Sequence, residues 1–355
     1  CSKLFFLLGY LLCWGMSSSV WAQKKAPLTT LPPDLDSLNA KPRIVLVARN
    51  YGDSVVLRWT PNRAAYWLNG LRRGYTIQRI EVTKQKPQGT ITNLTPTGIK
   101  PLPLDEMKRR FGPNDKMVGI AAQVMYGKKR NETGFSGEIG DVLTRSDEQL
   151  QQFTAGIMAA DFSLNAATAQ GLRWVDKSPK NPEALYVYRV WMNNPTPLPT
   201  NALQDTASLA VNPLQKNPPF APFIDGIISG DGAIILRWLK LSANGEFSGF
   251  FIERSEDGIN FRRLNDVPYV HTPPPNEVAQ KDSIRYRNVK DFQGLALYTD
   301  SVKVNYKKFY YRIVGIDVFG DLSPTSEVMM ASARDLTPPS IPKNVKVQVK
   351  DNKIA

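Results

Sequence analysis

The feature of this sequence that most constrains its fold is an internal repeat of three segments in the same order. Residues 53–59 read DSVVLRW and residues 231–238 read DGAIILRW. The second pair is GYTIQR and GFFIER, and the third pair is YVYRV and FYYRI. Three matched pairs in one order indicate two copies of the same structural unit along the chain.

Each repeated segment alternates apolar and polar residues, a period of two that is typical of β-strands with one buried face. In the first copy Val55, Leu57 and Trp59 share a face, and Arg58 is predicted to point outward to water, as is Arg237 in the second copy. The other apolar residues that fall on one face of their strands are Ile234, Leu236, Trp238, Tyr186, Tyr188, Val190, Phe309, Tyr311 and Ile313. Because Gly, Asp, Asn and Pro turns separate these strands, each copy is predicted to be a β-sandwich.

The repeated segments resemble fibronectin type III domains. In that family a core Trp on the second strand is followed by a third strand similar to G-Y-x-I-x-R and a sixth strand similar to Y-x-Y-R-V. Residues 315–326 also resemble the family's loop between the last two strands, with Gly320 and Ser323 in a D-x-x-G-x-x-S context. The resemblance covers most of residues 220–336 and the two ends of 42–212. It implies an all-β fold of tandem immunoglobulin-like sandwiches, and it says little about function because this fold has many roles.

One aromatic position distinguishes the two copies. The family often places a Tyr at the start of the sixth strand, where its hydroxyl bonds back to the preceding turn. Tyr186 is predicted to make this bond, whereas Phe309 aligns with it and has no hydroxyl. The second copy either uses Tyr310 or Tyr306 differently or lacks the bond.

The first copy is longer than an ordinary sandwich of about 100 residues, and the excess, at about 98–171, has helical character. Apolar residues recur at helical spacing in 104–111 and 117–126. Ser146 is predicted to open a capping box, and Asp161 or Ser163 to cap a further helix that ends at Gly171. The buried face between these caps is predicted to carry Leu150, Phe153, Ile157 and Met158. We expect a mainly helical insertion that covers an open face or edge of the sheet; the alternative is a partner-binding role.

The repeat and the flanking segments divide the chain into modules. Residues 342–354 parallel the start of the first copy at 42–56 and end before any Trp, so they are predicted to be the first strand of a third copy. A lone first strand cannot bury its apolar face, so the chain is expected to continue beyond Ala355; the alternative is a true C-terminus with a frayed tail. The predicted modules are a signal peptide at 1–22, a Pro-rich linker at 23–41, a first domain at 42–212, a second domain at 220–334, a linker at 335–341 and the truncated start of a third domain at 342–355.

The N-terminus has the pattern of a secretory signal peptide. Lys3 precedes an apolar run at 4–16, and small residues lead to a cleavage position after Ala22. The run is shorter than the roughly 20 residues that span a bilayer. Cleavage removes Cys1 and Cys13, so the exported chain is predicted to have neither a disulfide nor a transmembrane segment. The alternatives are a retained membrane anchor and lipid modification of Cys13, which the preceding Leu disfavours.

The chemistry-bearing residues are few. The 355 residues include one His and two Cys, which excludes a His-rich or multi-Cys metal site. His271 lies in a Pro-rich loop and is predicted to be a surface residue. Two pairs of carboxylates have the residue types with which glycosidases hydrolyse a glycosidic bond. They are Glu138 with Asp141 and Asp147 with Glu148. Both pairs are predicted to be charges at helix starts or in loops. We therefore predict no catalytic, cofactor-binding or metal-binding residues.

The net charge of +13 is spread along the chain and predicts a generally basic surface rather than a nucleic-acid site. Asn93 and Asn131 begin N-glycosylation acceptor patterns, which matter only in a eukaryotic secretory route.

Together these observations predict a non-enzymatic, exported structural or adhesion module in the periplasm, at the cell surface or outside the cell. Its linker and loops resemble those of bacterial arrays, particularly of Bacteroidota. Its partners are expected to be proteins or glycans, and the sequence identifies no binding residues. One alternative is the accessory region of a larger secreted enzyme. Another is a subunit of an envelope assembly that docks through residues 98–171.

Overall fold

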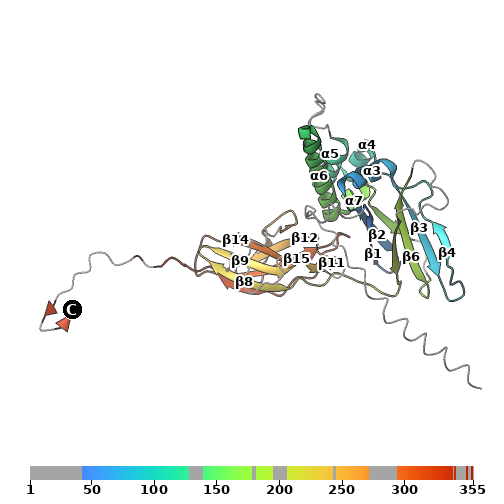
Figure 1. Cartoon of the computed structure of the whole chain (residues 1–355). Helices are drawn as coiled ribbons and strands as arrows, with labels where there is room; N and C mark the ends of the chain where they lie inside the picture. Colours follow the sequence, from blue (N-terminus) through green and yellow to red (C-terminus); the bar gives the residue numbers. More distant parts are fainter. Residues whose placement is uncertain are drawn as a thin grey trace, which may run out of the picture.

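The computed structural model describes residues 42–127, 139–177, 181–194, 206–242, 245–271, 294–338, 340, 349–350 and 353–354. The predicted signal peptide, the linker at 23–41, Asn131 and Glu138 lie outside the described residues. The main sheets of the described chain are antiparallel and lie in two regions, with helices gathered beside the first (Figure 1). We call residues 42–211 the first β region and residues 224–332 the second β region.

The first β region contains two antiparallel sheets that share one core. The three-stranded sheet has the order β1-β2-β5, and the four-stranded sheet has the order β4-β3-β6-β7. Trp59 of the first sheet meets Tyr75 of the second edge-to-face, with ring centroids 5.7 Å apart. The predicted inward face is confirmed, because Val55, Leu57 and Trp59 are fully buried. The strands are β1 (Ile44–Asn50), β2 (Val55–Pro61), β3 (Tyr75–Val82), β4 (Thr90–Asn93), β5 (Arg173–Asp176), β6 (Leu185–Met192) and β7 (Thr206–Val211).

The second β region repeats this arrangement. Its sheets have the orders β14-β9-β8 and β13-β12-β15-β16, and Ile234, Leu236 and Trp238 are again fully buried between them. A short hairpin, β10–β11, lies between β9 and β12, and a second hairpin, β17–β18, lies near the end of the chain. The strands are β8 (Ile224–Gly230), β9 (Ala233–Leu239), β10 (Leu241–Ser242), β11 (Gly245–Glu246), β12 (Gly249–Ser255), β13 (Arg262–Arg263), β14 (Leu295–Ser301), β15 (Lys308–Ile316), β16 (Met329–Ser332), β17 (Val349–Lys350) and β18 (Lys353–Ile354).

A buried polar triad ties the two sheets together in each region. In the first region Asp176 accepts hydrogen bonds from Arg79 at 2.8 Å and from the Tyr188 hydroxyl at 2.7 Å. In the second region the carboxylate is Asp300, and its donors are Arg254 at 2.7 Å and Tyr311 at 2.8 Å. The two Asp residues occupy matching positions on β5 and β14, opposite Val55 of β2 and Ile234 of β9. The internal repeat therefore includes a shared hydrogen-bonded centre as well as a shared apolar pattern.

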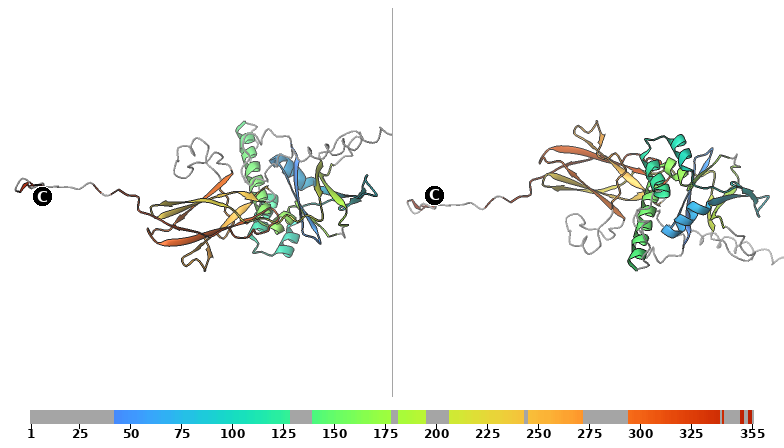
Figure 2. Two further views of the ribbon diagram at one scale, coloured as in Figure 1. Left: turned by 90° about the horizontal axis from the view of Figure 1, so that it is seen from below. Right: turned by 90° about the horizontal axis from the view of Figure 1, so that it is seen from above.

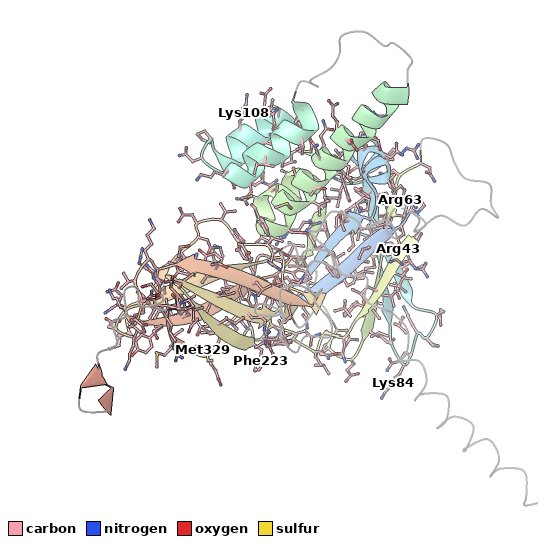
Figure 3. The ribbon with its side chains drawn as sticks, turned by 60° about the vertical axis from the view of Figure 1, so that its left-hand side comes forward. Arg43, Arg63, Lys84, Lys108, Phe223 and Met329 are labelled. Atoms are coloured by element: carbon pink, nitrogen blue, oxygen red, sulfur yellow. The ribbon has the colours of Figure 1, made fainter. Side chains whose placement is uncertain are left out.

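The insertion is helical, as predicted, and one further helix was not predicted. The segments 104–111 and 117–126 correspond to α4 and α5, and α6 and α7 follow before β5. The unpredicted helix, α3, connects β2 to β3 and buries Trp67 against Phe153 of α6. In Figure 3, α4 and α5 lie beside α6, with Lys108 of α4 pointing outward. The helices are α3 (Ala64–Arg73), α4 (Leu104–Phe111), α5 (Lys116–Tyr126), α6 (Ile139–Phe162) and α7 (Leu164–Ala169).

The helix caps agree with the sequence only in part. Ser163 caps α7, because its hydroxyl accepts a hydrogen bond from the Ala166 amide at 3.3 Å. The capping box predicted at Ser146 is wrong, since that residue lies inside the long helix α6. Asp161 is not a cap either; its carboxylate is buried against β2. Among the described residues, no helix is both long and apolar enough to cross a membrane.

The Tyr predicted to bond back to its preceding turn does so. The Asn181 amide donates to the Tyr186 hydroxyl, and this hydroxyl donates to the Asn181 carbonyl at 3.3 Å. The rings at both positions lie beneath a guanidinium: that of Arg79 is 5.6 Å from the Tyr186 centroid, and that of Arg254 is 5.0 Å from the Phe309 centroid. Tyr306 is 70% exposed, so it does not replace the missing hydroxyl inside the core.

Candidate functional site: the joint between the two β regions

The most elaborate constellation of buried polar and apolar groups lies where the two β regions meet. Figures 1 and 2 show the two β regions next to each other. The loop at 317–322, which follows β15, rests against the outer face of the sheet β1-β2-β5. Val318 and Phe319 of this loop pack with three valines, and Phe319 is only 1% exposed. The valines are Val47, Val56 and Val175. We call residues 317–322 the joint loop. We call its contact with the sheet β1-β2-β5 the joint, and we include in the joint the side chains described in the next three paragraphs.

The D-x-x-G-x-x-S pattern explains the shape of the joint loop. The Asp317 carboxylate accepts hydrogen bonds from the amides of Phe319 at 2.9 Å and Asp321 at 3.2 Å. Gly320 has a φ of 76°, a left-handed conformation that favours glycine. The Ser323 hydroxyl accepts from the Gly315 amide at 2.9 Å and so closes the base of the loop. These local bonds hold the Phe319 ring where it can pack on the neighbouring region.

Opposite charges meet across the joint. Arg49 of β1 forms ion pairs with Asp317 and Asp321, and its guanidinium lies 4.6 Å from the centroid of the Phe319 ring. The Tyr51 hydroxyl donates to Asp321 at 2.5 Å. The side chains of Arg49 and Asp317 are 2% and 1% exposed, so the pair is screened from water. Burial raises the pKa of Asp317, and the charge of Arg49 opposes that rise.

The helical insertion also contributes to the joint. Phe162, at the end of α6, lies so close to Gly249 of β12 that a Cβ there would be 3.2 Å from its Cε1 atom. Leu164, at the start of α7, approaches Gly320, where a Cβ would be 2.9 Å from its Cγ atom. Glycine at both positions therefore permits the close contact between the insertion and the second β region.

The prediction that Arg58 is exposed to water is wrong. It points away from the core, as the strand alternation requires, but it is fully buried beneath the insertion. Its Nη2 atom lies 2.9 Å from Oδ1 of Asp161, and its Nη1 atom donates to the Leu172 carbonyl at 3.2 Å. Burial raises the pKa of Asp161 to about 6, although the charge of Arg58 lowers it. This ion pair anchors the end of α6 to the sheet that receives the joint loop.

Among the described residues, the side chains of the types considered for catalysis do not come together. His271 is half-buried rather than a surface residue; its Nδ1 atom lies 3.4 Å from the Tyr269 hydroxyl. Burial, together with the charge of Lys240, lowers the pKa of His271 to about 4. Asp147 is exposed on α6 and Glu148 is half-buried beside it, within the helix rather than at its start. The side chain of Asp141, also on α6, lies outside the described part. The described residues contain no group of three or more His, Cys, Asp or Glu side chains that could hold a metal ion.

The glycosylation pattern at Asn93 has a structural explanation. Asn93 is exposed at the end of β4, and its side-chain oxygen accepts from the Thr95 amide at 3.3 Å. Thr95 is 5% exposed, and its hydroxyl accepts from the Ile77 amide at 2.8 Å. Both side chains therefore form the turn that follows β4.

No family model matches the chain, and no curated protein sequence is significantly similar to it. Solved structures with similar parts include a β-1,2-glucanase from Parabacteroides distasonis, at 17% identity over 43% of this chain and a TM-score of 0.23. This chain covers only 18% of the glucanase chain. The chicken interferon gamma receptor alpha chain is 5% identical over 83% of this chain and 98% of its own, with a TM-score of 0.25. Titin module A71 from human cardiac muscle is 17% identical over 32% of this chain and 89% of its own, with a TM-score of 0.18. Likenesses this low identify neither fold nor function.

Proposed function

We propose that this chain is a non-catalytic structural module of an exported protein, in which two fibronectin type III-like domains are held as one rigid spacer. The domains would be residues 42–212 and 220–334. The repeated strand orders, the repeated Arg–Asp–Tyr triads and the loop pattern at 317–323 support this assignment. The export part rests on the N-terminal pattern alone. N-terminal sequencing of the exported protein is expected to begin at Gln23.

The joint is the observation that carries the spacer proposal. Domains connected only by a linker are expected to move relative to each other unless their interface is substantial and well packed. Here a guanidinium from one region is enclosed between two carboxylates and an aromatic ring from the other. Removing one partner of a buried ion pair costs about 3–5 kcal/mol because the other charge stays buried. A change of orientation would separate Arg49 from Asp317 and expose the buried Phe319 ring to water, so one relative orientation is favoured.

Small-angle X-ray scattering of the exported chain tests this proposal directly. The wild type is expected to scatter as a particle of one fixed shape, whereas Arg49→Ala, compared at the same concentration, is expected to increase both the radius of gyration and the maximum dimension. Arg237→Ala is the matched control, because Arg237 pairs within the second β region and lies outside the joint. Near-ultraviolet circular dichroism establishes that all three proteins are folded. Unchanged scattering of folded Arg49→Ala would show that the joint does not fix the orientation.

A further inference from the structure

The strand β4 forms an exposed edge of the first β region. It pairs with β3 on one side, and it is the terminal strand in the order β4-β3-β6-β7. All four of its residues are exposed, and Ile91 retains 59% of its surface. Figures 1 and 2 show β4 at the end of the molecule that is remote from the second β region. It is therefore accessible while the joint is closed.

The backbone of β4 offers hydrogen-bonding groups at this edge. The Leu94 amide donates to the Ile77 carbonyl of β3 at 2.9 Å. In an antiparallel ladder, alternate residues turn their N–H and C=O groups to opposite sides. The register of β3 with β4 therefore directs the backbone N–H and C=O groups of Thr90 and Thr92 toward β3. It turns those of Ile91 and Asn93 toward the free edge.

The face of this sheet that points away from the core is nearly uncharged behind the edge, although Ile80 on that face is only 8% exposed. The strand register places Ile91 beside Ile80, followed by Val187 on β6. The outward positions of the four strands are Thr76, Gln78, Ile80, Val82, Ile91, Asn93, Leu185, Val187, Arg189, Trp191, Thr206, Ser208 and Ala210. Arg189 is the single ionisable residue among these positions, although the chain has a net charge of +13.

The equivalent edge of the second β region is built differently. Its terminal strand, β13, has two residues, Arg262 and Arg263, and both are exposed. A short, charged edge strand discourages pairing with another chain, and this is a common protective device. The sequence of β4, Thr-Ile-Thr-Asn, contains neither a charge nor a proline. The two copies of the repeat have therefore diverged at this edge, and the first copy has the one suited to pairing.

We propose that β4 pairs antiparallel with β4 of a second copy of this chain, so that the two four-stranded sheets continue into one another across a two-fold axis. Directly opposed residues of an antiparallel pair point to the same face, so Ile91 lies opposite Ile91 of the partner subunit and extends the apolar strip. Both residues turn their backbone groups to the shared edge and exchange two hydrogen bonds. Lys84 and Lys86 lie in the turn before β4 (Figure 3 shows Lys84). In the antiparallel pair the turns of the two copies lie at opposite ends, so these lysines do not face their counterparts.

A second copy fits this edge better than an acidic or basic partner would, since β4 presents no charge for either to pair with. The proposal does not depend on the spacer function, because the joint and β4 share no residues. A chain with a loosened joint still dimerises through β4, and a monomeric chain still has its joint.

Sedimentation velocity of the exported chain over a concentration series tests the pairing. The wild type is expected to form a reversible dimer, and Ile91→Lys to weaken it at least about ten-fold by placing two ammonium groups opposite each other. Ile259→Lys is the matched control, because Ile259 is 80% exposed on the second β region, away from β4; it is expected to dimerise like the wild type. A wild type that stays monomeric overturns the proposal, as does a dimer that survives Ile91→Lys or is lost in Ile259→Lys.

Hydrogen exchange on the unmodified chain provides a second test that needs no variant to fold. The amides of Ile91 and Asn93 are expected to gain protection as the concentration rises through the dimerisation range. If these amides exchange at the same rate at every concentration while the dimer forms, another surface makes the contact. Protection of β4 only after a different extended peptide is added would assign the edge to that peptide instead, and would also overturn the proposal.

Discussion

The two β regions share a strand motif but differ in what covers it. On β2 and β9 the same Leu-Arg-Trp sequence turns its Arg away from the core. Arg58 is fully buried against Asp161 of α6, whereas the Arg237 side chain is 15% exposed and pairs with Asp225 of the adjacent strand at 2.5 Å. Strand alternation thus determines the direction of a side chain, and elements elsewhere in the chain determine whether it meets water.

The largest predicted effect is the difference in stability between the variants that lack one or the other of these arginines. Arg58→Ala leaves the Asp161 carboxylate buried without its partner, so the free energy of unfolding is expected to fall by about 3–5 kcal/mol. Arg237→Ala removes an ion pair that is partly accessible to water and is expected to cost no more than about 1 kcal/mol. Denaturant unfolding followed by Trp fluorescence measures both.

A double variant sharpens this comparison. Replacing both partners, Arg58→Met with Asp161→Leu, removes the uncompensated charge and is expected to recover most of the lost stability. If Arg58→Ala and Arg237→Ala cost the same, the burial of Arg58 has no energetic consequence and the contrast between the regions fails.

Two glycines with similar backbone angles are expected to differ less than the two arginines do in the stability cost of their replacement by alanine. Gly320 in the joint loop has a φ of 76°, and Gly258 in the hairpin between β12 and β13 has a φ of 78°. Alanine at either position is strained in this left-handed conformation by about 1–2 kcal/mol. A Cβ at Gly258 makes only ordinary contact with Tyr310 at 3.5 Å, whereas a Cβ at Gly320 would be 2.9 Å from Cγ of Leu164.

Gly320→Ala is therefore expected to cost about 1 kcal/mol more than Gly258→Ala, because Leu164 must also move. Only Gly320→Ala is expected to change the scattering profile. The measurements are denaturant unfolding and small-angle scattering of both variants. Equal costs and equal scattering would mean that α7 does not press on the joint loop.

The sequence predicted the strands well because a repeated period of two constrains each copy independently. It located Gly320 in the joint loop and Ser323 at its base, and it placed α4 within its observed bounds. It did not identify Arg49 or Asp317 as partners, because their contact joins residues that are 268 positions apart, and nothing local marks the receiving face. The signal for α3 was present in Trp67 and Leu71, which lie four residues apart on one helical face.

Other errors have a common physical origin. Ser146 has the local pattern of a helix start, but α6 begins earlier, at Ile139, so the pattern lies in its interior. Asp161 has a residue type that caps helices, yet packing against β2 places it beside Arg58. Tertiary burial overrode the local preference at Asp161, whereas Ser146 is exposed in the interior of a helix that begins earlier. No alternation in the sequence reports which helix lies over which strand.

The smallest net effect is expected from a change of pH. Asp161 in the first β region and His271 in the second change the stability of the folded chain in opposite directions. Asp161 has a pKa of about 6 in the folded chain, raised from 3.8, so the folded state binds its proton first. Its contribution to stability therefore rises as the pH falls from about 6 toward 3.8. His271 has a pKa of about 4, lowered from 6.5, so the unfolded state binds its proton first. The second β region therefore loses stability as the pH falls from 6.5 toward 4.

Thermal unfolding between neutral pH and about pH 4.5 is expected to separate these two contributions. Asp161→Asn removes the gain assigned to the first β region, so this variant loses more stability on acidification than the wild type does. His271→Gln removes the loss assigned to the second β region, so this variant tolerates acid better. The two variants must deviate from the wild type in opposite directions if burial, rather than charge pairing, dominates both groups. A deviation of Asp161→Asn in the same direction as His271→Gln would mean that Arg58 holds the pKa of Asp161 below its usual value, so that charge pairing outweighs burial at this carboxylate.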